Sequence, residues 1–537
     1  MSFLKVYGAP TFGLGVVALL ILQQASHEEG RFSLLSIFHR RSGSRRSRQK
    51  FKGSIRRIGS GDFRYVVEDD GDQSYGQLMD RLGVTPQSGT PKRPLTSPLP
   101  PRAGNRFSTR AIKSLGLEEP LVICMVGLPA RGKSYLVKMI ERYLKWSGYE
   151  CEVFNVGNLR RGQGFAAVDA AFFDPSNQNG KQIREKMAME VQDNMYAWLH
   201  EKTQDNSSSS RIAIFDATNT TKKRRLNLAN RAQQEHAGIL FVESICDDQE
   251  VLQRNYRMKL KNDDYKNMDP AAALKDFADR VSAYERIYEE VGDEEQSEQV
   301  SYIKIINVGQ KIITRNCSGF LSSEISFYLM NVHIHPKRIF LSLVVDEESD
   351  SAVPVEAPPR TVHSGDFHAE WLGRFFETLE KMQPDCKNML CLTGSAQSHL
   401  ESVLHLRPNL QVVSTQLLNE LRGGDFQGLS LQEIQKLFPG EFAKREQNRL
   451  SYRNPGVGGE SYLDVLERVK PVVIELERQR RSVLVVGHVA VLRCIYAYFL
   501  GVPLKEMPHI QIKRDTLLEI TTSPFGSTVK TINPSET

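Results

Sequence analysis

Apolar runs and helical stripes alternate along the chain from about residue 120 onwards. Short continuous apolar segments are typical of buried parallel strands, and apolar residues at every third or fourth position are typical of helices. The predicted strands cover Leu121–Val126, Glu152–Val156, Arg211–Phe215, Ile239–Ile245 and Ser301–Val308. The predicted helices cover Tyr135–Trp146 and Ile183–Leu199. Strands that alternate with helices predict an α/β domain with a parallel sheet.

A second α/β unit begins at Arg338. Its predicted strands cover Ile339–Val345, Met389–Leu392 and Ser482–Val486, and its predicted helices cover Glu460–Arg478 and Val489–Leu500. We see no internal repeat between the two halves. The pattern therefore predicts one domain over residues 115–336, a second over 337–522, and a tail over 523–537.

Residues 27–114 show neither the apolar runs of strands nor the apolar spacing of helices. They are rich in Ser, Arg, Gly and Pro and are predicted to be a disordered basic arm. Ser42, Ser47 and Ser60 lie beside or shortly after paired arginines, and Ser97 precedes a proline. Protein kinases are therefore expected partners, and each phosphate would add about −1.5 to −2 charge. The alternative is a passive solvated tail.

An apolar segment, Val6–Leu22, lies within residues 1–26. Its 17 residues are at the short limit for a membrane span, and its Gly and Pro residues weaken a helix. Membrane tethering through residues 6–22 and a short docking segment both stay open.

Composition narrows the class of protein. The 537 residues are 40% hydrophobic and 25% charged, which suits a soluble chain of two or three domains. Seven cysteines without a Cys-x-x-Cys pair exclude a disulfide-stapled secreted scaffold, so a cytoplasmic protein is expected. Residues 1–113 hold 19 Lys and Arg against 8 Asp and Glu, a net +11, so the net +6 of the chain leaves −5 for the remainder. The basic excess is in the arm, and no nucleic-acid partner is expected.

Residues 127–134 read Gly-Leu-Pro-Ala-Arg-Gly-Lys-Ser and match the pattern Gly-x4-Gly-Lys-Ser/Thr. The motif follows an apolar strand and opens a helix, which is the context that a phosphate-binding loop requires. Backbone N–H groups of such a loop wrap a polyphosphate, and the helix dipole adds to the attraction. Lys133 is expected to reach the β- and γ-phosphates, and the Ser134 hydroxyl to bind Mg²⁺ as the cofactor of ATP.

Asp216 ends the predicted strand Arg211–Phe215. A carboxylate at this position, beside a phosphate-binding loop, can hold the Mg²⁺ shell or orient an acceptor hydroxyl. A strand-terminal Asp is often only a helix cap, but its pairing with the loop favours the functional interpretation.

Four motifs together resemble the 6-phosphofructo-2-kinase/fructose-2,6-bisphosphatase family, over about residues 115–522. They are the loop at 127–134, Phe-Asn-Val-Gly-Asn-Leu-Arg-Arg at 154–161, Phe-Asp-Ala-Thr-Asn-Thr-Thr at 215–221, and Ser-Tyr-Ile-Lys-Ile-Ile-Asn-Val-Gly at 301–309. The resemblance implies a P-loop NTPase-like kinase domain followed by a phosphoglycerate-mutase-like α/β domain. It implies transfer of the γ-phosphoryl of ATP to the 2-hydroxyl of fructose 6-phosphate, which makes fructose 2,6-bisphosphate, a regulator of glycolysis.

The resemblance also implies roles for particular residues. The implied ATP-binding residues are Gly127, Leu128, Pro129, Ala130, Arg131, Gly132, Lys133, Ser134, Tyr135 and Asn255. The implied sugar-phosphate residues are Arg160, Arg184, Thr218, Arg224, Arg280 and Tyr284. A sugar phosphate is a dianion, which arginine binds well because its guanidinium can bond two oxygens. The implied catalytic residues are Lys133, Asp216 and Lys259, with Ser134 and Asp216 as the metal ligands.

The second domain departs from the family pattern. The family places a nucleophilic His in an Arg-His-Gly-Glu turn after the first strand, where this chain has Leu343, Val344, Val345 and Asp346. Val344 cannot form a phosphohistidine, and a later phosphate-binding Arg is replaced within Thr393–His399. Glu460 and His488 persist at the positions of the family's acid/base Glu and second His. We therefore predict a degenerate phosphatase site.

Two alternatives to a single-activity kinase stay open. One is a bifunctional enzyme with altered phosphatase chemistry. The other is a non-catalytic regulatory protein that senses ATP or fructose 6-phosphate. A homodimer is compatible with the sequence but is not indicated by it.

Overall fold

The computed structural model describes most of the chain after residue 119. The described residues are 52–58, 62–68, 120–201, 211–293, 295, 300–333, 336–344, 364–382, 386, 388–403, 406, 410–523 and 526–533. The chain forms two compact units, residues 1–102 and 103–537. No helix in the described ranges is long and apolar enough to cross a membrane. The apolar segment 6–22 and the four candidate phosphorylation sites lie outside these ranges.

The first unit contains one β-hairpin within the arm that we predicted to be disordered. Strand β1 (Lys52–Ile58) pairs antiparallel with β2 (Asp62–Glu68), and Lys52 lies opposite Glu68. The two strands alternate too weakly between apolar and polar residues for the pattern to have predicted them.

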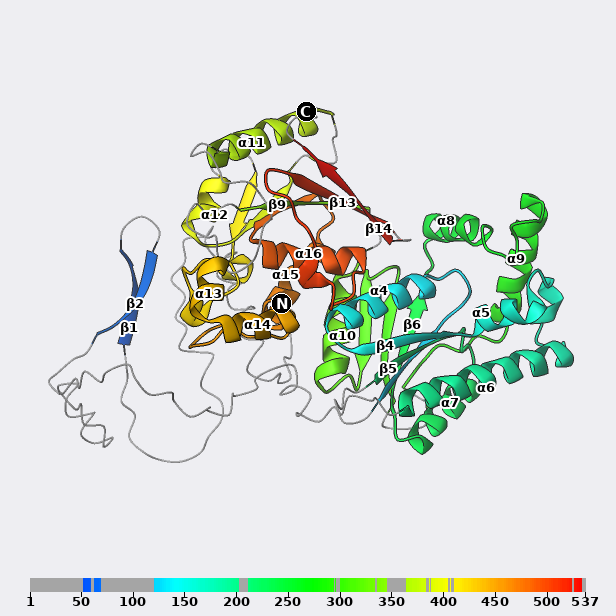
Figure 1. Ribbon diagram of the computed structural model, residues 1–537. Coiled ribbons are helices and arrows are strands. Elements are labelled where there is room, and N and C mark those ends of the chain that lie inside the picture. The colour runs from blue at the N-terminus through cyan, green and yellow to red at the C-terminus, as the bar shows by residue number, and fades with distance from the viewer. Residues whose placement is uncertain are drawn as a thin grey trace. The chain divides into compact units, whose positions relative to one another are not determined.

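The first half of the second unit is built on a six-stranded sheet in the order β4-β5-β3-β6-β7-β8 (Figure 1). The strands are β3 (Leu121–Val126), β4 (Glu150–Asn155), β5 (Arg211–Asp216), β6 (Gly238–Ile245), β7 (Ser301–Ile306) and β8 (Lys311–Arg315). All neighbours are parallel except β7 and β8. The loops after β3 and β5 therefore leave the same edge of the sheet, where α/β proteins bind their ligands.

Helices connect these strands. They are α4 (Lys133–Trp146), α5 (Val156–Arg160), α6 (Gln178–His200), α7 (Lys222–Gln234), α8 (Gln249–Lys259), α9 (Pro270–Glu285) and α10 (Phe320–Asn331). Helix α6 begins five residues before the predicted start at Ile183, because the side chain of Asn177 caps it by accepting a hydrogen bond from Gly180 N. Arg184 is thus in its second turn instead of at its start.

The second half contains another six-stranded sheet, in the order β11-β10-β12-β9-β13-β14. Its strands are β9 (Arg338–Leu343), β10 (Leu390–Thr393), β11 (Gln411–Ser414), β12 (Val483–Gly487), β13 (Leu517–Ser523) and β14 (Gly526–Ile532). Its helices are α11 (Ser364–Met382), α12 (Gln397–Ser402), α13 (Leu431–Leu437), α14 (Pro439–Gln447), α15 (Tyr462–Arg478) and α16 (Val489–Leu500). The prediction of two α/β units is confirmed.

The prediction that residues 523–537 form a tail was wrong for most of those that the structure describes. Residues 526–532 form β14, which pairs antiparallel with β13 and places Ile532 opposite Leu517. Ile532 is buried against the sheet, so this strand belongs to the second domain. The apolar pattern did not predict β14 because an edge strand buries few of its side chains, so its composition can be polar.

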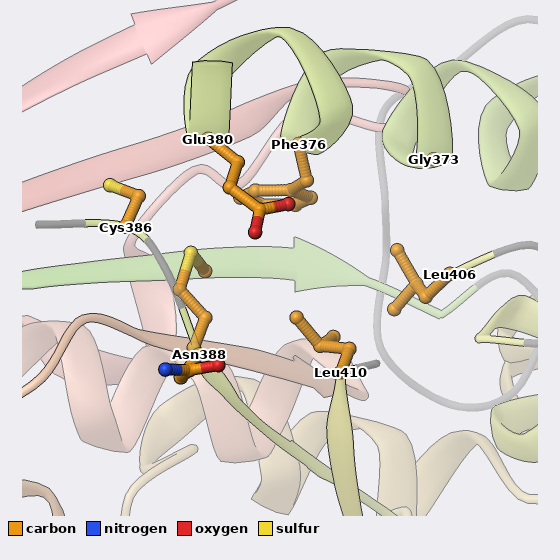
Figure 2. Close-up of a pocket in the computed structure, with 8 residues that line it drawn as sticks. Gly373, Phe376, Glu380, Cys386, Asn388, Leu406 and Leu410 are labelled. Atoms are coloured by element: carbon orange, nitrogen blue, oxygen red, sulfur yellow. The ribbon is translucent and has the colours of Figure 1, made fainter. Parts of the chain in front are cut away.

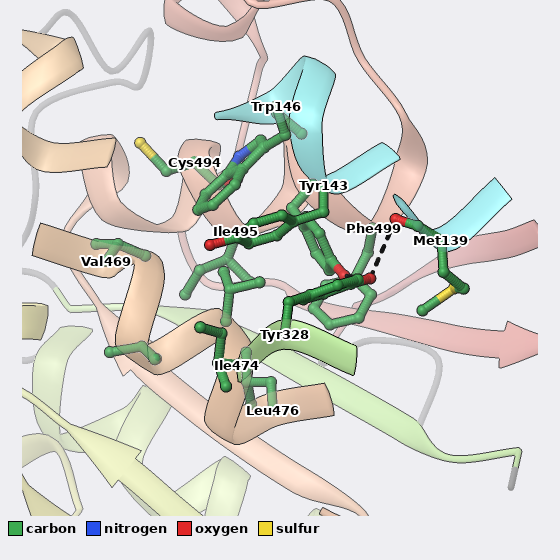
Figure 3. Packing of buried hydrophobic residues seen from close by; sticks show 14 of the residues in the cluster. Met139, Tyr143, Trp146, Tyr328, Val469, Ile474, Leu476, Cys494, Ile495 and Phe499 are labelled. Atoms are coloured by element: carbon green, nitrogen blue, oxygen red, sulfur yellow. Dashed lines mark hydrogen bonds between the residues drawn. The ribbon is translucent and has the colours of Figure 1, made fainter. Parts of the chain in front are cut away.

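A single hydrophobic cluster, which we call the shared core, runs through both halves. On the side of α4 that faces the second half, Tyr143 stacks on Tyr328 of α10 with ring centroids 4.2 Å apart. The indole of Trp146 donates a hydrogen bond of 2.9 Å to the carbonyl of Cys494 in α16. Figure 3 shows α4, α10, α15 and α16 meeting around these rings. The helix that carries the phosphate-binding motif is therefore packed against both halves.

Candidate active site

The loop between β3 and α4 has the backbone geometry of a phosphate cradle. Gly127 has φ of 130°, and a Cβ on it would lie 2.5 Å from the carbonyl oxygen of Ser244, so only glycine fits there. Gly132 has φ of 93°, again in the region that favours glycine. No side chain caps the N-terminus of α4, and its first turn contains no acidic residue. Its leading N–H groups are thus available to an anion.

Lys133 is buried in this loop. Its Nζ donates hydrogen bonds to the carbonyl oxygens of Gly127 at 2.8 Å and Leu128 at 2.6 Å. Burial lowers the pKa of Lys133 to about 7, and Asp216 partly opposes that effect. Ser134, one residue later, is exposed. The loop thus holds its lysine inward and presents its hydroxyl outward.

Asp216 lies at the carboxyl end of β5, close to this lysine. It is 6% exposed, and Asn155 Nδ2 donates a hydrogen bond of 2.5 Å to its Oδ2. Burial raises the pKa of the Asp216 carboxyl, while Lys133 and Lys259 oppose that effect. Burial likewise lowers the pKa of Lys259, with Arg280 adding to the shift. The three predicted catalytic groups are therefore near enough to influence one another's charge.

Other residues assigned to the ATP site surround the loop. Asn255 of α8 donates a hydrogen bond of 3.0 Å to the carbonyl oxygen of Ala130. Arg131 bonds Tyr256 Oη and Glu285, each at 3.2 Å, and so ties the loop to α8 and α9. The Tyr135 hydroxyl donates to the carbonyl oxygen of His333, so its side chain is engaged outside the loop.

Four of the six predicted sugar-phosphate residues lie around the ring of Phe173. The guanidinium carbons of Arg280, Arg160 and Arg184 lie 3.8, 5.4 and 5.9 Å from the centre of its ring. The ring of Tyr284 has its centroid 6.0 Å from that of Phe173. Three cationic side chains from α5, α6 and α9 thus meet around one aromatic ring, which stabilises them by cation–π attraction.

Arg224 and Thr218 are the other two predicted sugar-phosphate residues, and both follow β5 in the chain. Arg224 Nε donates to Asn219 Oδ1 at 3.0 Å, and burial lowers its pKa. The carbonyl oxygen of Thr218 accepts a hydrogen bond of 2.9 Å from Gly127 N. The segment after β5 therefore contacts the loop through its backbone, and its Arg224 lies within electrostatic range of Arg184 and Tyr284.

Sequence reasoning missed two residues in this region, Phe173 and Asp264. Phe173 sits in a short helical turn over Ala170–Phe173, and Asp264 in the turns after α8. Neither belongs to a contiguous motif, so their only sequence signal is a large aromatic and an acid among arginine-bearing segments. Asp264 accepts hydrogen bonds from Arg160 Nη2 at 2.8 and 2.6 Å.

The position of the expected phosphatase nucleophile is part of a hydrophobic core. Val344 is 4% exposed and packs in a cluster with Phe340 and Val486, and its N–H bonds the Gly487 carbonyl at 3.0 Å. His488 is the N-cap residue of α16, and its ring centroid lies 4.6 Å from that of His399.

Glu460, the other residue that persists in the second domain, is held by Arg468. Arg468 Nε lies 3.0 Å from Glu460 Oε1, and Arg422 N donates to Oε2 at 3.0 Å. The carboxylate therefore serves an ion pair and a backbone contact. A hydrocarbon side chain at position 344 supplies no atom that could attack phosphorus.

A pocket in the second half is lined partly by residues of the hydrophobic cluster that contains Val344. Phe376, Glu380, Cys386, Leu406 and Leu410 are among its lining residues (Figure 2). None of its lining residues belongs to a predicted site.

Comparison with known proteins matches each half to a family. Residues 109–336 match the family described as 6-phosphofructo-2-kinase, and residues 396–534 match the histidine phosphatase superfamily, branch 1. A probable 6-phosphofructo-2-kinase of Schizosaccharomyces pombe is 34% identical over 76% of this chain and 69% of its own length. Proteins of Caenorhabditis elegans and Rattus norvegicus named 6-phosphofructo-2-kinase/fructose-2,6-bisphosphatase are each 36% identical, over 75% and 77% of this chain and 86% and 85% of their own lengths. The chain belongs to the 6-phosphofructo-2-kinase family.

Proposed function

We propose that this chain transfers the γ-phosphoryl group of ATP to the 2-hydroxyl of fructose 6-phosphate. The observation that carries the proposal is the placement of Lys133, Asp216 and Lys259 beside a phosphate-binding loop, with three arginines gathered at Phe173. The loop suits a polyphosphate, and the arginine group suits a phosphate dianion.

The reaction breaks the bond between the γ-phosphorus and the oxygen that bridges to the β-phosphate. The 2-oxygen of the sugar forms the new bond to phosphorus, ADP keeps the electron pair of the broken bond, and the hydroxyl loses its proton. Lys133 and Lys259 offset the charge on the transferring group. Asn155 engages Asp216 Oδ2, which leaves Oδ1 to accept a hydrogen bond from the attacking hydroxyl. Burial raises the pKa of Asp216, which suits a group that takes up that proton.

The donor set fits Mg²⁺ bound with ATP. No group of three or more His, Cys, Asp or Glu side chains within the described ranges could hold a metal ion alone. Mg²⁺ typically binds through one or two protein oxygens plus phosphate oxygens and water. The exposed Ser134 hydroxyl would supply a protein oxygen, and the Asp216 carboxylate would supply another where it holds the metal shell instead of the acceptor hydroxyl. The ion would neutralise phosphate charge when bound.

We infer that the second half does not hydrolyse fructose 2,6-bisphosphate. Val344 occupies the nucleophile position, and Glu460 is engaged by Arg468. These contacts favour a kinase with a structural second domain over a bifunctional enzyme.

The test is ADP formation by the purified full chain with Mg²⁺ and ATP, in the presence and absence of fructose 6-phosphate. We expect ADP to form only with the sugar and in equal amount to a new sugar bisphosphate, identified by ³¹P NMR. Asp216→Asn should lower the rate at least a hundredfold. Binding of both ligands without ADP formation would instead establish the sensor alternative.

A further inference from the structure

Asp264 is a buried carboxylate that the reaction as written does not use. It is 5% exposed and lies among three arginines, two of them adjacent in the sequence and the third on α9. Arg160 Nη2 bonds both of its oxygens, Arg280 Nη1 lies 3.4 Å from Oδ2, and Arg161 Nη1 lies 3.7 Å from Oδ2. Burial alone would raise the pKa of this carboxyl, but the arginines hold it below its ordinary value. Asp264 is therefore the counter-ion of an arginine cluster.

Two of the three arginines on Phe173, Arg160 and Arg280, differ in how many of their N–H donors have an acceptor. Arg160 is 4% exposed, and its guanidinium is divided between Asp264 and the carbonyl oxygen of Phe165. Arg280 makes a longer bond to Asp264, and within the described residues its buried Nε has no hydrogen-bond partner. Arg280 thus has unused donor capacity, whereas Arg160 has little.

Without Asp264, three positively charged arginine side chains would lie together with no carboxylate between them. Arg160, Arg161 and Arg280 would repel one another in a region with little water to screen them. Their side chains would then separate, and Arg280 would lose both its contact at Oδ2 and its fixed position 3.8 Å above the Phe173 ring.

We propose that Asp264 is a positioning residue for the sugar phosphate, which holds Arg280 against Phe173 with its free donors directed to the phosphate of fructose 6-phosphate. This inference rests on the proposed function. Asp264 itself does not touch the substrate, because two anions would repel. Its contribution is to assemble the cations before the substrate arrives, which reduces the cost of ordering them on binding.

The test compares Asp264→Asn with Asp263→Asn. Asp263 is the adjacent acid, its side chain is 64% exposed, and it forms an ion pair with Lys266 on the surface. We expect Asp264→Asn to raise the KM for fructose 6-phosphate at least tenfold with the KM for ATP within twofold of wild type. Asp263→Asn should leave both values within twofold. Stabilisation of each variant by ATP in thermal unfolding checks that the fold and the nucleotide site persist.

A double-mutant cycle separates positioning from a general structural role. If Asp264 acts through Arg280, then Asp264→Asn in an Arg280→Ala background should change the KM for fructose 6-phosphate by less than threefold. If Asp264→Asn does not fold, Arg280→Lys tests the same geometry. It keeps the charge but loses the planar contacts with Phe173 and Asp264, and it should raise that KM at least tenfold.

Three outcomes would overturn the inference. A lower KM for fructose 6-phosphate in Asp264→Asn would show that the carboxylate competes with the substrate. Equal rises in both KM values would show a purely structural role. An unchanged KM in Asp264→Asn, or in Arg280→Lys where that variant is the one tested, would show that Arg280 needs no support. A wild-type chain without sugar-dependent ADP formation would instead refute the proposed function.

Discussion

Replacing Glu477 with glutamine tests how firmly the second half holds the helix that carries Lys133. Glu477 lies near the end of α15 and is 3% exposed. Its carboxylate contacts Arg142 of α4 at 2.6 Å, Lys337 at 3.2 Å and the Tyr498 hydroxyl at 2.8 Å. Burial alone would raise the pKa of Glu477, yet Lys337 and Arg142 keep it below its ordinary value. The glutamine keeps the volume and removes the charge.

The expected loss follows from the two cations left behind. Removing one partner of a buried ion pair destabilises a protein by roughly 3–5 kcal/mol. Lys337 keeps the carbonyl oxygens of Leu476 and Glu477 as acceptors, and the side chain of Arg142 is 18% exposed. Both cations therefore keep some polar or solvent contact in the variant. We expect a loss in the free energy of unfolding at the lower end of that range, about 3 kcal/mol.

The assay is urea unfolding followed by tryptophan fluorescence, since Trp146 lies in the shared core. Glu475→Gln is the matched control, because this residue is on the same helix but its pair with Arg478 is partly exposed. It should change the free energy of unfolding by less than about 0.5 kcal/mol. A carboxyl whose pKa is below its ordinary value of 4.5 in the folded protein stabilises the fold at pH values above 4.5. The difference in the free energy of unfolding between wild type and Glu477→Gln should therefore shrink as the pH falls below that value. A loss under 1 kcal/mol at neutral pH would refute the reasoning.

The remaining predictions concern the two sites. Lys133→Ala should abolish sugar-dependent ADP formation; activity within threefold of wild type would contradict its role. Because the buried Lys133 has a pKa of about 7 and ATP phosphates would raise it, ATP binding above pH 7 should take up a proton and weaken as pH rises. Calorimetry in two buffers of different ionisation enthalpy measures this, and equal heats would contradict it. Arg280→Ala should raise the KM for fructose 6-phosphate roughly tenfold to a hundredfold, as expected from a lost charge-assisted bond, with the KM for ATP unchanged. Neither wild type nor Val344→His should release fructose 6-phosphate from labelled fructose 2,6-bisphosphate; release that His488→Ala abolishes would show a hydrolytic route.

Contiguous motifs could be recognised from the sequence because their geometry depends on neighbouring residues of the chain. The two glycines of the loop, the lysine and serine that follow, and the aspartate at the end of β5 lie within a few residues of the backbone features that position them. The apolar runs likewise predicted two α/β units, since a strand buried on both faces must be apolar along its length. The prediction of a degenerate phosphatase site is likewise local, because it depends on the one residue at position 344.

The tertiary structure decided what depends on residues far apart in the chain. Arg160, Arg184 and Arg280 meet at Phe173 only because three helices converge there. Asp264 becomes a counter-ion of Arg160 and Arg280 only by that convergence. Periodicity shows which face of a helix is apolar but not which partner covers it. It could not show that the face of α4 ending at Trp146 packs into the second half, nor that Lys133 is buried. Burial and charge pairing are properties of the assembled fold, because both depend on what surrounds a side chain in space.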